Sequence, residues 1–86
     1  MSKNLAVCGD FGGNNPSLVT FKMLLLDELQ PFGIEAITVS ETNYKKDDLI
    51  LIFIGEMDDG NVDAVHQAIE NVITSLGGNY HYPDNN

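Results

Sequence analysis

Short runs of apolar residues along the chain predict three β-strands. The clearest run is residues 49–54, six apolar residues in succession, and such continuity is typical of a strand buried on both faces. Shorter runs at residues 4–7 and 34–39 predict two further strands. Residues 79–82 are a candidate for a short edge strand near the C-terminus. We therefore expect a sheet in which residues 49–54 form the central strand.

Two other stretches carry apolar residues at the spacing of an α-helix. In the first, Asn15 is the expected N-cap and Pro16 the first helical residue, while Pro31 and Gly33 end the helix. Its apolar stripe contains Leu18, Phe21, Leu25 and Leu29, widened by Val19, Met23 and Leu26. The second helix follows Asn61 and stops at the two glycines 77–78. Its stripe contains Val62, Val65, Ile69, Val72 and Leu76.

The order of these elements predicts the α/β class: a small, sandwich-like β-α-β-β-α domain, with residues 79–82 as a possible last strand at the edge. The 86 residues suffice for one domain, residues 1–86. A helix joins the first two strands, so we expect these strands to be parallel, with a right-handed crossover. Nine residues, 40–48, separate the second strand from the third. This length fits either a parallel or an antiparallel relation, and the pattern leaves both open.

The first helix is apolar around more than half of its circumference. A sheet this small has limited room to cover it, so the surplus predicts either a homodimer contact or a partner groove on this helix, with Phe21 and Leu25 in the contact. The alternative is that a small sheet simply wraps around a strongly apolar helix.

Charge is the clearest compositional signal. Thirteen acidic residues against four basic ones give a formal net charge of −9. Such a surface repels nucleic-acid phosphates and anionic membranes, so we expect neither direct nucleic-acid binding nor membrane binding. It favours a basic protein partner. The expected contact acids are the densest group in the sequence: Glu56, Asp58, Asp59 and Asp63. The alternative is that the acids serve solubility alone.

The single cysteine excludes an internal disulfide and makes a reducing compartment the default. The longest apolar run has six residues, against about 20 needed to span a bilayer, and the first residues do not resemble a secretory signal. We therefore expect a cytoplasmic protein.

The same cysteine stands at the start of a glycine-rich segment, Cys8-Gly9-Asp10-Phe11-Gly12-Gly13, that leads into the first helix. This N-terminal part, about the first 38 residues, resembles the enzyme IIB components of the sugar phosphotransferase system. The resemblance implies that Cys8 is a phosphoryl acceptor and that Ser17 helps to bind the phosphate. The alternative is that Cys8 is a small packed side chain. We expect Asp10 and the negative potential of the chain to raise the pKa of the thiol.

Carboxylates also follow two of the predicted strands. In a parallel sheet, Asp10 would share the carboxyl edge with Glu56 and Asp58, where oxygen ligands could hold Mg²⁺ or Ca²⁺. The alternative is a solvated acidic helix start, since carboxylates there are favoured by the helix dipole. We expect no cofactor.

The sequence contains no assembled catalytic constellation, which favours a binding protein over an enzyme. We expect a small acidic protein-binding or regulatory module. One version is an inhibitor, of phage or mobile-element type, that occupies the basic nucleic-acid-binding surface of its partner. A phosphoryl carrier using Cys8 and a small-ligand or metal binder at the strand ends are the alternatives.

Overall fold

The computed structural model describes residues 2–35, 37–44 and 47–81, without the side chains at 2, 3, 42–44, 47, 48, 56 and 59. The strands are β1 (Ser2–Asp10), β2 (Ile37–Tyr44), β3 (Asp47–Asp58) and β4 (Asn79–His81). The helices are α1 (Leu18–Leu29) and α2 (Val62–Ser75), with short 3-10 helices η1 (Gln30–Phe32) and η2 (Asp59–Asn61). The predicted α/β class and order of elements are confirmed, including the short last strand.

The four strands form one antiparallel sheet in the order β2-β3-β1-β4. The sequence left open whether the second and third strands are parallel or antiparallel. In the structure they form an antiparallel hairpin, in which β2 pairs with β3 from Ile37 opposite Ile54 to Tyr44 opposite Asp47. Because β3 is antiparallel to both β1 and β2, these two strands are parallel to each other, as predicted. They are not neighbours, since β3 lies between them. This is the split β-α-β arrangement of ferredoxin-like folds.

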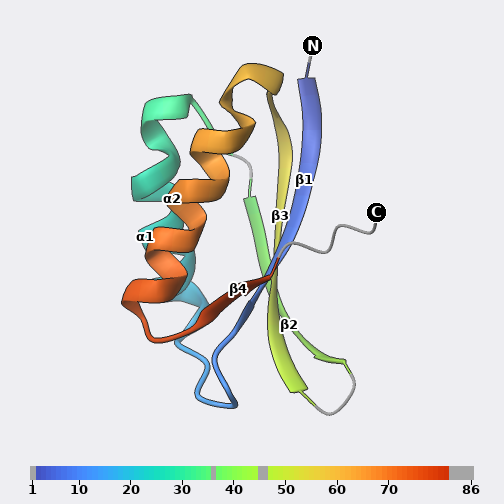
Figure 1. Cartoon of the computed structure of the whole chain (residues 1–86), viewed down its shortest axis with the longest axis vertical. Coiled ribbons are helices and arrows are strands. Elements are labelled where there is room, and N and C mark those ends of the chain that lie inside the picture. Colours follow the sequence, from blue (N-terminus) through green and yellow to red (C-terminus); the bar gives the residue numbers. More distant parts are fainter. Residues whose placement is uncertain (1, 36, 45–46, 82–86) are drawn as a thin grey trace.

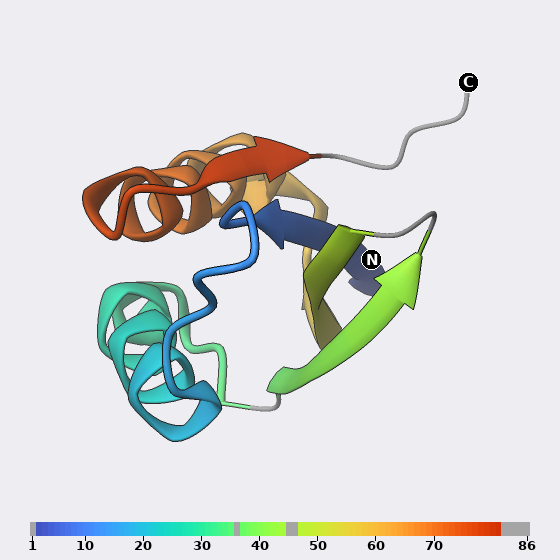
Figure 2. The ribbon, with the colours of Figure 1, turned by 90° about the horizontal axis from the view of Figure 1, so that it is seen from below.

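Both helices lie on the same face of the sheet (Figures 1 and 2). The two crossover connections are β1-α1-β2 and β3-α2-β4. They start from neighbouring antiparallel strands and run towards opposite edges of the sheet, so a half-turn about the sheet normal maps one onto the other. When both crossovers are right-handed, both helices therefore lie on the same face. Between the layers lies a core of aliphatic and aromatic side chains, led by the fully buried Val7, Phe21, Leu25, Leu29, Ile50, Ile52, Ile54, Val65, Ile69 and Ile73.

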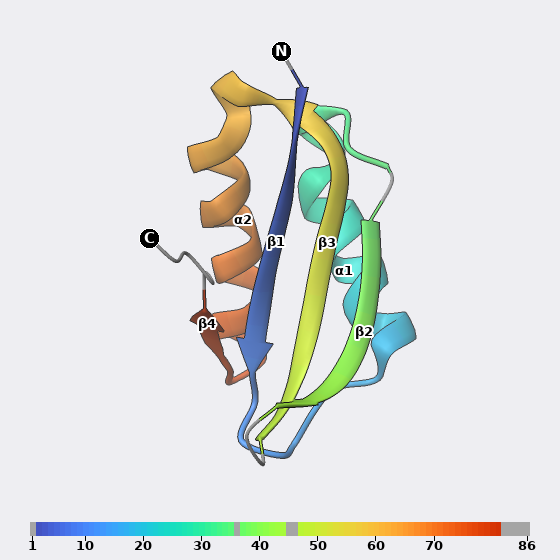
Figure 3. The same ribbon diagram turned by 90° about the vertical axis from the view of Figure 1, so that its right-hand side faces the viewer.

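No described residue forms a covering layer over the other face of the sheet, which faces the viewer in Figure 3. The prediction that residues 49–54 are buried on both faces is therefore wrong. Ile50, Ile52 and Ile54 point into the core, whereas Leu51 and Phe53 alternate to the uncovered face and are 39% and 44% exposed. The strand is central, as predicted, but a two-layer fold can bury only one of its faces.

The ring of Phe11 closes the end of the core where β1 meets the turn before β4. It is buried and makes an edge-to-face contact with Phe21, with ring centroids 5.8 Å apart. A Cβ atom on Gly78 would lie 2.6 Å from the Phe11 ring, so this position must lack a side chain. On the other side of the turn, Tyr80 of β4 is hydrogen-bonded to His66 of α2. The short strand is thus held by α2 as well as by β1.

Replacing Ile52 with alanine should lower the free energy of unfolding by about 2 to 5 kcal/mol, because the side chain is 1% exposed and a cavity would remain. The matched control is Leu51→Ala one residue away, which should cost about half of that or less, because Leu51 already contacts water. Urea unfolding in dilute solution measures both. Equal losses would show that β3 is buried on both faces.

Candidate protein-interaction site

Helix α1 begins at Leu18, two residues later than predicted, because Ser17 rather than Asn15 is its N-cap. The Ser17 hydroxyl accepts a hydrogen bond from the Thr20 backbone N–H at 3.5 Å and caps the helix. Asn15, the predicted cap, instead donates from its side-chain amide to a carboxylate oxygen of Glu41 on β2, at 3.1 Å. Starting from Ser17, the helix presents every fourth residue to the sheet, namely Phe21, Leu25 and Leu29.

Phe21 and Leu25 were predicted as contact residues, and this prediction is wrong. Both side chains are fully buried in the core of the chain, because the face of α1 that carries them lies against the sheet. The apolar surplus of the helix is real, but other residues provide it. Val19 is 71% exposed and Met23 is 64% exposed, one turn apart on the outer side of the helix, and Leu24 is also exposed.

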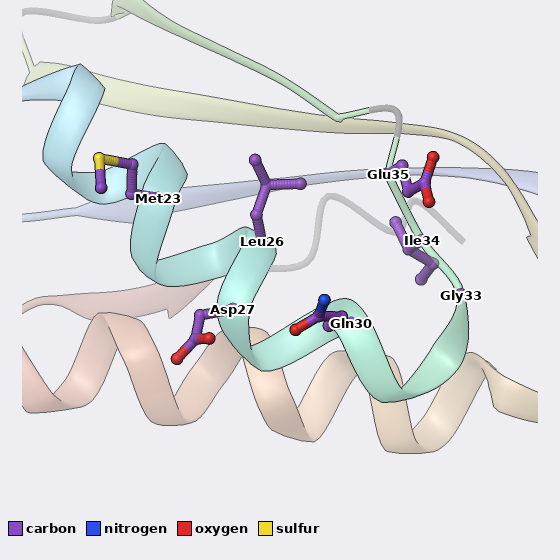
Figure 4. A pocket seen from close by; sticks show the side chains of 7 residues that line it. All are labelled: Met23, Leu26, Asp27, Gln30, Gly33, Ile34 and Glu35. Atoms are coloured by element: carbon purple, nitrogen blue, oxygen red, sulfur yellow. The ribbon is translucent and has the colours of Figure 1, made fainter.

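A hollow of about 340 Å³ lies beside these residues at the C-terminal half of α1 (Figure 4). We call it the α1 groove. Its lining residues are Met23, Leu26, Asp27, Gln30, Gly33, Ile34 and Glu35. In Figure 4, Met23 and Leu26 project from α1 to the same side, whereas Asp27 projects towards α2. The groove thus combines apolar side chains with two carboxylates.

A second hollow, of about 310 Å³, lies between the two helices. It is lined by Leu24, Asp27, Glu28, Asn71, Val72 and Ser75. Asp27 lines both hollows, so the last turns of α1 form an acidic ridge with a depression on each side.

These carboxylates lie where a helix normally places cations. Asp27 and Glu28 occupy the end of α1, and the last turn contains no basic residue. The C-terminus of a helix carries a partial negative charge, so each carboxylate there is destabilising by about 0.3 to 1 kcal/mol. In α2 the arrangement is favourable, because Asp63 lies in its first turn. The two helices therefore differ: α1 carries unfavourable charge at its C-terminal end, and α2 carries favourable charge at its N-terminal end.

The acidic residues predicted from the sequence lie at the same end of the molecule. Helix α1 ends and α2 begins at this end, next to the end of β3 (Figure 1). Asp58, Asp63 and Glu35 are exposed, whereas the side chains of the predicted Glu56 and Asp59 lie outside the described part of the chain. Among the four basic residues, only Lys22 has a described side chain, and it is exposed.

The contact acids predicted from the sequence do not include Asp27, Glu28 and Glu35. A local signal for them was present in the sequence. Asp27 and Glu28 are adjacent acids shortly before Pro31 and Gly33, which end the helix, whereas the C-terminal end of a helix normally favours basic residues.

Cys8 lies within β1 rather than in a loop, opposite Leu51 of β3 and His81 of β4. Its neighbours Val7 and Gly9 are buried against the helix layer, so the thiol points to the uncovered face. Ser17 caps α1 on the helix side of the sheet. The structure therefore does not bring Cys8 and Ser17 together. Burial raises the pKa of the Cys8 thiol, the predicted direction but with desolvation as its cause. The phosphoryl-carrier resemblance stays a prediction.

The alternative metal site is contradicted by the strand directions. Because β1 and β3 are antiparallel, Asp10 pairs with Leu49 and Asp58 pairs with Ser2, at opposite ends of the two strands. Eight residues of strand, about 26 Å, separate these positions. Within the described residues there is no group of three or more His, Cys, Asp or Glu side chains that could hold a metal ion.

Comparison with protein-family models gives no match, and comparison with curated protein sequences gives none either. Among solved structures, the chain is similar to a C-terminal segment of the alpha subunit of aIF2 from Pyrococcus abyssi, with 16% sequence identity and a TM-score of 0.44. The match covers 99% of this chain and 52% of that one, so the chain spans about half its length. None of the described helices is long and apolar enough to cross a membrane.

The charge arrangement predicts opposite effects for two similar substitutions. Glu28→Gln should raise the free energy of unfolding by about 0.3 to 1 kcal/mol, because it removes a negative charge from the C-terminal end of α1. Asp63→Asn should lower it by about the same amount, because Asp63 lies at the favourable end of α2. Urea unfolding at low ionic strength measures both. Two changes of the same sign would exclude the helix dipole as their cause.

The thiol of Cys8 should titrate above the ordinary thiol value of about 8.5, because burial disfavours the thiolate. The rate of alkylation by iodoacetamide as a function of pH measures this pKa. The same chain unfolded in urea is the control, and its thiol should titrate at a lower pH. An apparent pKa below about 7 in the folded chain would instead support an activated, phosphoryl-accepting cysteine.

Proposed function

We propose that this chain is a small acidic protein-binding module that occupies a basic surface of a partner protein through the α1 groove and the acids around it. The single observation that supports the proposal is the groove itself. It is an apolar hollow with carboxylates in its lining, next to the exposed Met23, on a chain with a net charge of −9.

The chemistry of the groove suits a lysine or arginine side chain of the partner. Such a side chain has an aliphatic stem that packs on apolar surface and a charged head that needs a carboxylate. Met23, Leu26 and Ile34 would contact the stem, while Asp27 and Glu35 would receive the head group. A cation at this point also relieves the unfavourable charge at the end of α1.

The surrounding acids would steer the encounter. Asp58 and Asp63 are exposed at the same end of the molecule, and exposed charges of one sign raise the rate of association with an oppositely charged surface. A basic surface of this kind is what nucleic-acid-binding proteins present to phosphates. The proposed module therefore acts as a competitor that prevents the partner from binding nucleic acid.

The proposal is tested with the tagged chain as bait in a lysate of the organism that makes it. We expect it to capture basic, nucleic-acid-binding proteins that are released as sodium chloride rises from about 50 to about 500 mM, because salt screens exposed charges. Duplex DNA or RNA added at low salt should release them as well.

A variant with Met23→Gln, Asp27→Asn and Glu35→Gln should lose most of this capture. The matched control is Phe53→Thr on the uncovered face of the sheet, which should capture normally. Capture that survives high salt, or that the triple variant retains in full, would contradict the proposal.

A further inference from the structure

The uncovered face of the sheet carries an apolar patch at its centre. Ala6 and Cys8 of β1 lie opposite Phe53 and Leu51 of β3 in the strand register, so the four side chains form a two-by-two block. We call this block the sheet patch. Phe53 and Leu51 are among the large apolar side chains that the chain leaves exposed. Nothing in the described residues covers them.

The patch has neutral neighbours, in contrast to the helix side. Thr38 and Ser40 of β2 pair with Phe53 and Leu51, and both are uncharged. On β4, His81 pairs with Cys8. Asp10 lies two residues along β1 from Cys8, and its Oδ2 is 3.8 Å from Nε2 of His81. A basic partner would find no free carboxylate at the centre of this face, and a nucleic acid would find no cluster of cations.

We propose that this face binds a second copy of the chain. Two copies of a strongly acidic protein can approach each other only where their own charge is lowest, and among the described surfaces the sheet patch meets this condition. The patch is also self-complementary. The large Leu51 and Phe53 of β3 lie beside the small Ala6 and Cys8 of β1. A two-fold axis that runs parallel to the strands, between two facing sheets, would therefore place the large residues of each copy over the small residues of the other.

The size of the face is sufficient for a weak dimer. Strands of nine, eight, twelve and three residues, at about 3.3 Å per residue and about 4.8 Å between strands, give a face of roughly 500 Å². Two copies would then bury roughly 1,000 Å², the lower limit for a specific interface. We therefore expect a dissociation constant in the micromolar range, and a dimer in which two sheets pack face to face.

Charge gives this dimer a characteristic salt dependence. Each copy carries a net charge of −9, so the two repel each other outside the patch. Salt screens this repulsion, and the dimer should become tighter as salt increases. The proposed contact with a basic partner has the opposite dependence, so the two proposals can fail separately.

Sedimentation equilibrium of the whole chain, at concentrations up to about 500 µM, tests the proposal. We expect a monomer–dimer equilibrium whose dissociation constant falls by about threefold or more between about 50 and about 500 mM sodium chloride. Phe53→Thr, which keeps a strand-forming residue, should raise the constant by about tenfold or more. The control Met23→Gln, on the exposed side of α1, should leave it unchanged.

Two further measurements make the outcome independent of any single variant. Ser40→Glu places a charge at the rim of the patch and should also prevent dimerisation, even if Phe53→Thr proves unstable by circular dichroism. Alkylation of Cys8 at fixed pH should slow as the concentration of the chain rises, because the dimer covers the thiol.

Three outcomes would overturn the proposal: a chain that stays monomeric, a dimer that weakens as salt increases, or a dimer that is lost in Met23→Gln but kept in Phe53→Thr. If the chain stays monomeric, and the lysate capture yields a different protein whose capture is lost in Phe53→Thr, the patch binds that protein instead of a second copy.

Discussion

The pairing of β3 with β1 on one side and β2 on the other is the constraint on which the rest of the structure depends. It directs Ile50, Ile52 and Ile54 towards the helices, and these side chains are the centre of the core. The alternation of a strand then leaves Leu51 and Phe53 on the far side, whatever their preference for burial. The uncovered apolar patch is thus a direct consequence of how the core is built.

The two faces of the domain differ in electrostatic character. Carboxylates concentrate on the helix side and at the end where α1 stops, including two that the dipole of α1 disfavours. The centre of the sheet face is neutral and apolar. A molecule with this division can contact a cationic surface on one side and an uncharged apolar surface on the other without one contact obstructing the other.

Most secondary structure could be predicted from the sequence because its signals are local. The 3.6-residue spacing of α2 and the apolar run of β3 are complete within each segment. The site was harder to predict, because it depends on long-range relations. Whether Phe21 or Met23 faces the core depends on the rotation of α1 over the sheet, and the sequence stripe includes both. Asp10 and Asp58 share an edge only if β1 and β3 are parallel, and no local signal determines the direction of that pairing. The N-cap of α1 depends on local sequence, but the sequence offers two good capping residues, Asn15 and Ser17, and does not distinguish between them.

The register of β1 also determines the order in which the chain can fold. The hairpin of β2 and β3 needs only neighbouring residues, so it can form as soon as both strands have left the ribosome. β1 is synthesised before this hairpin but pairs with β3 and, at its last residues, with β4. The strand therefore has no pairing partner, and its apolar residues stay exposed to solvent, until most of the domain has been synthesised. During synthesis the apolar residues of this strand are therefore accessible to aggregation or to chaperones, although in the finished fold the strand lies inside the sheet.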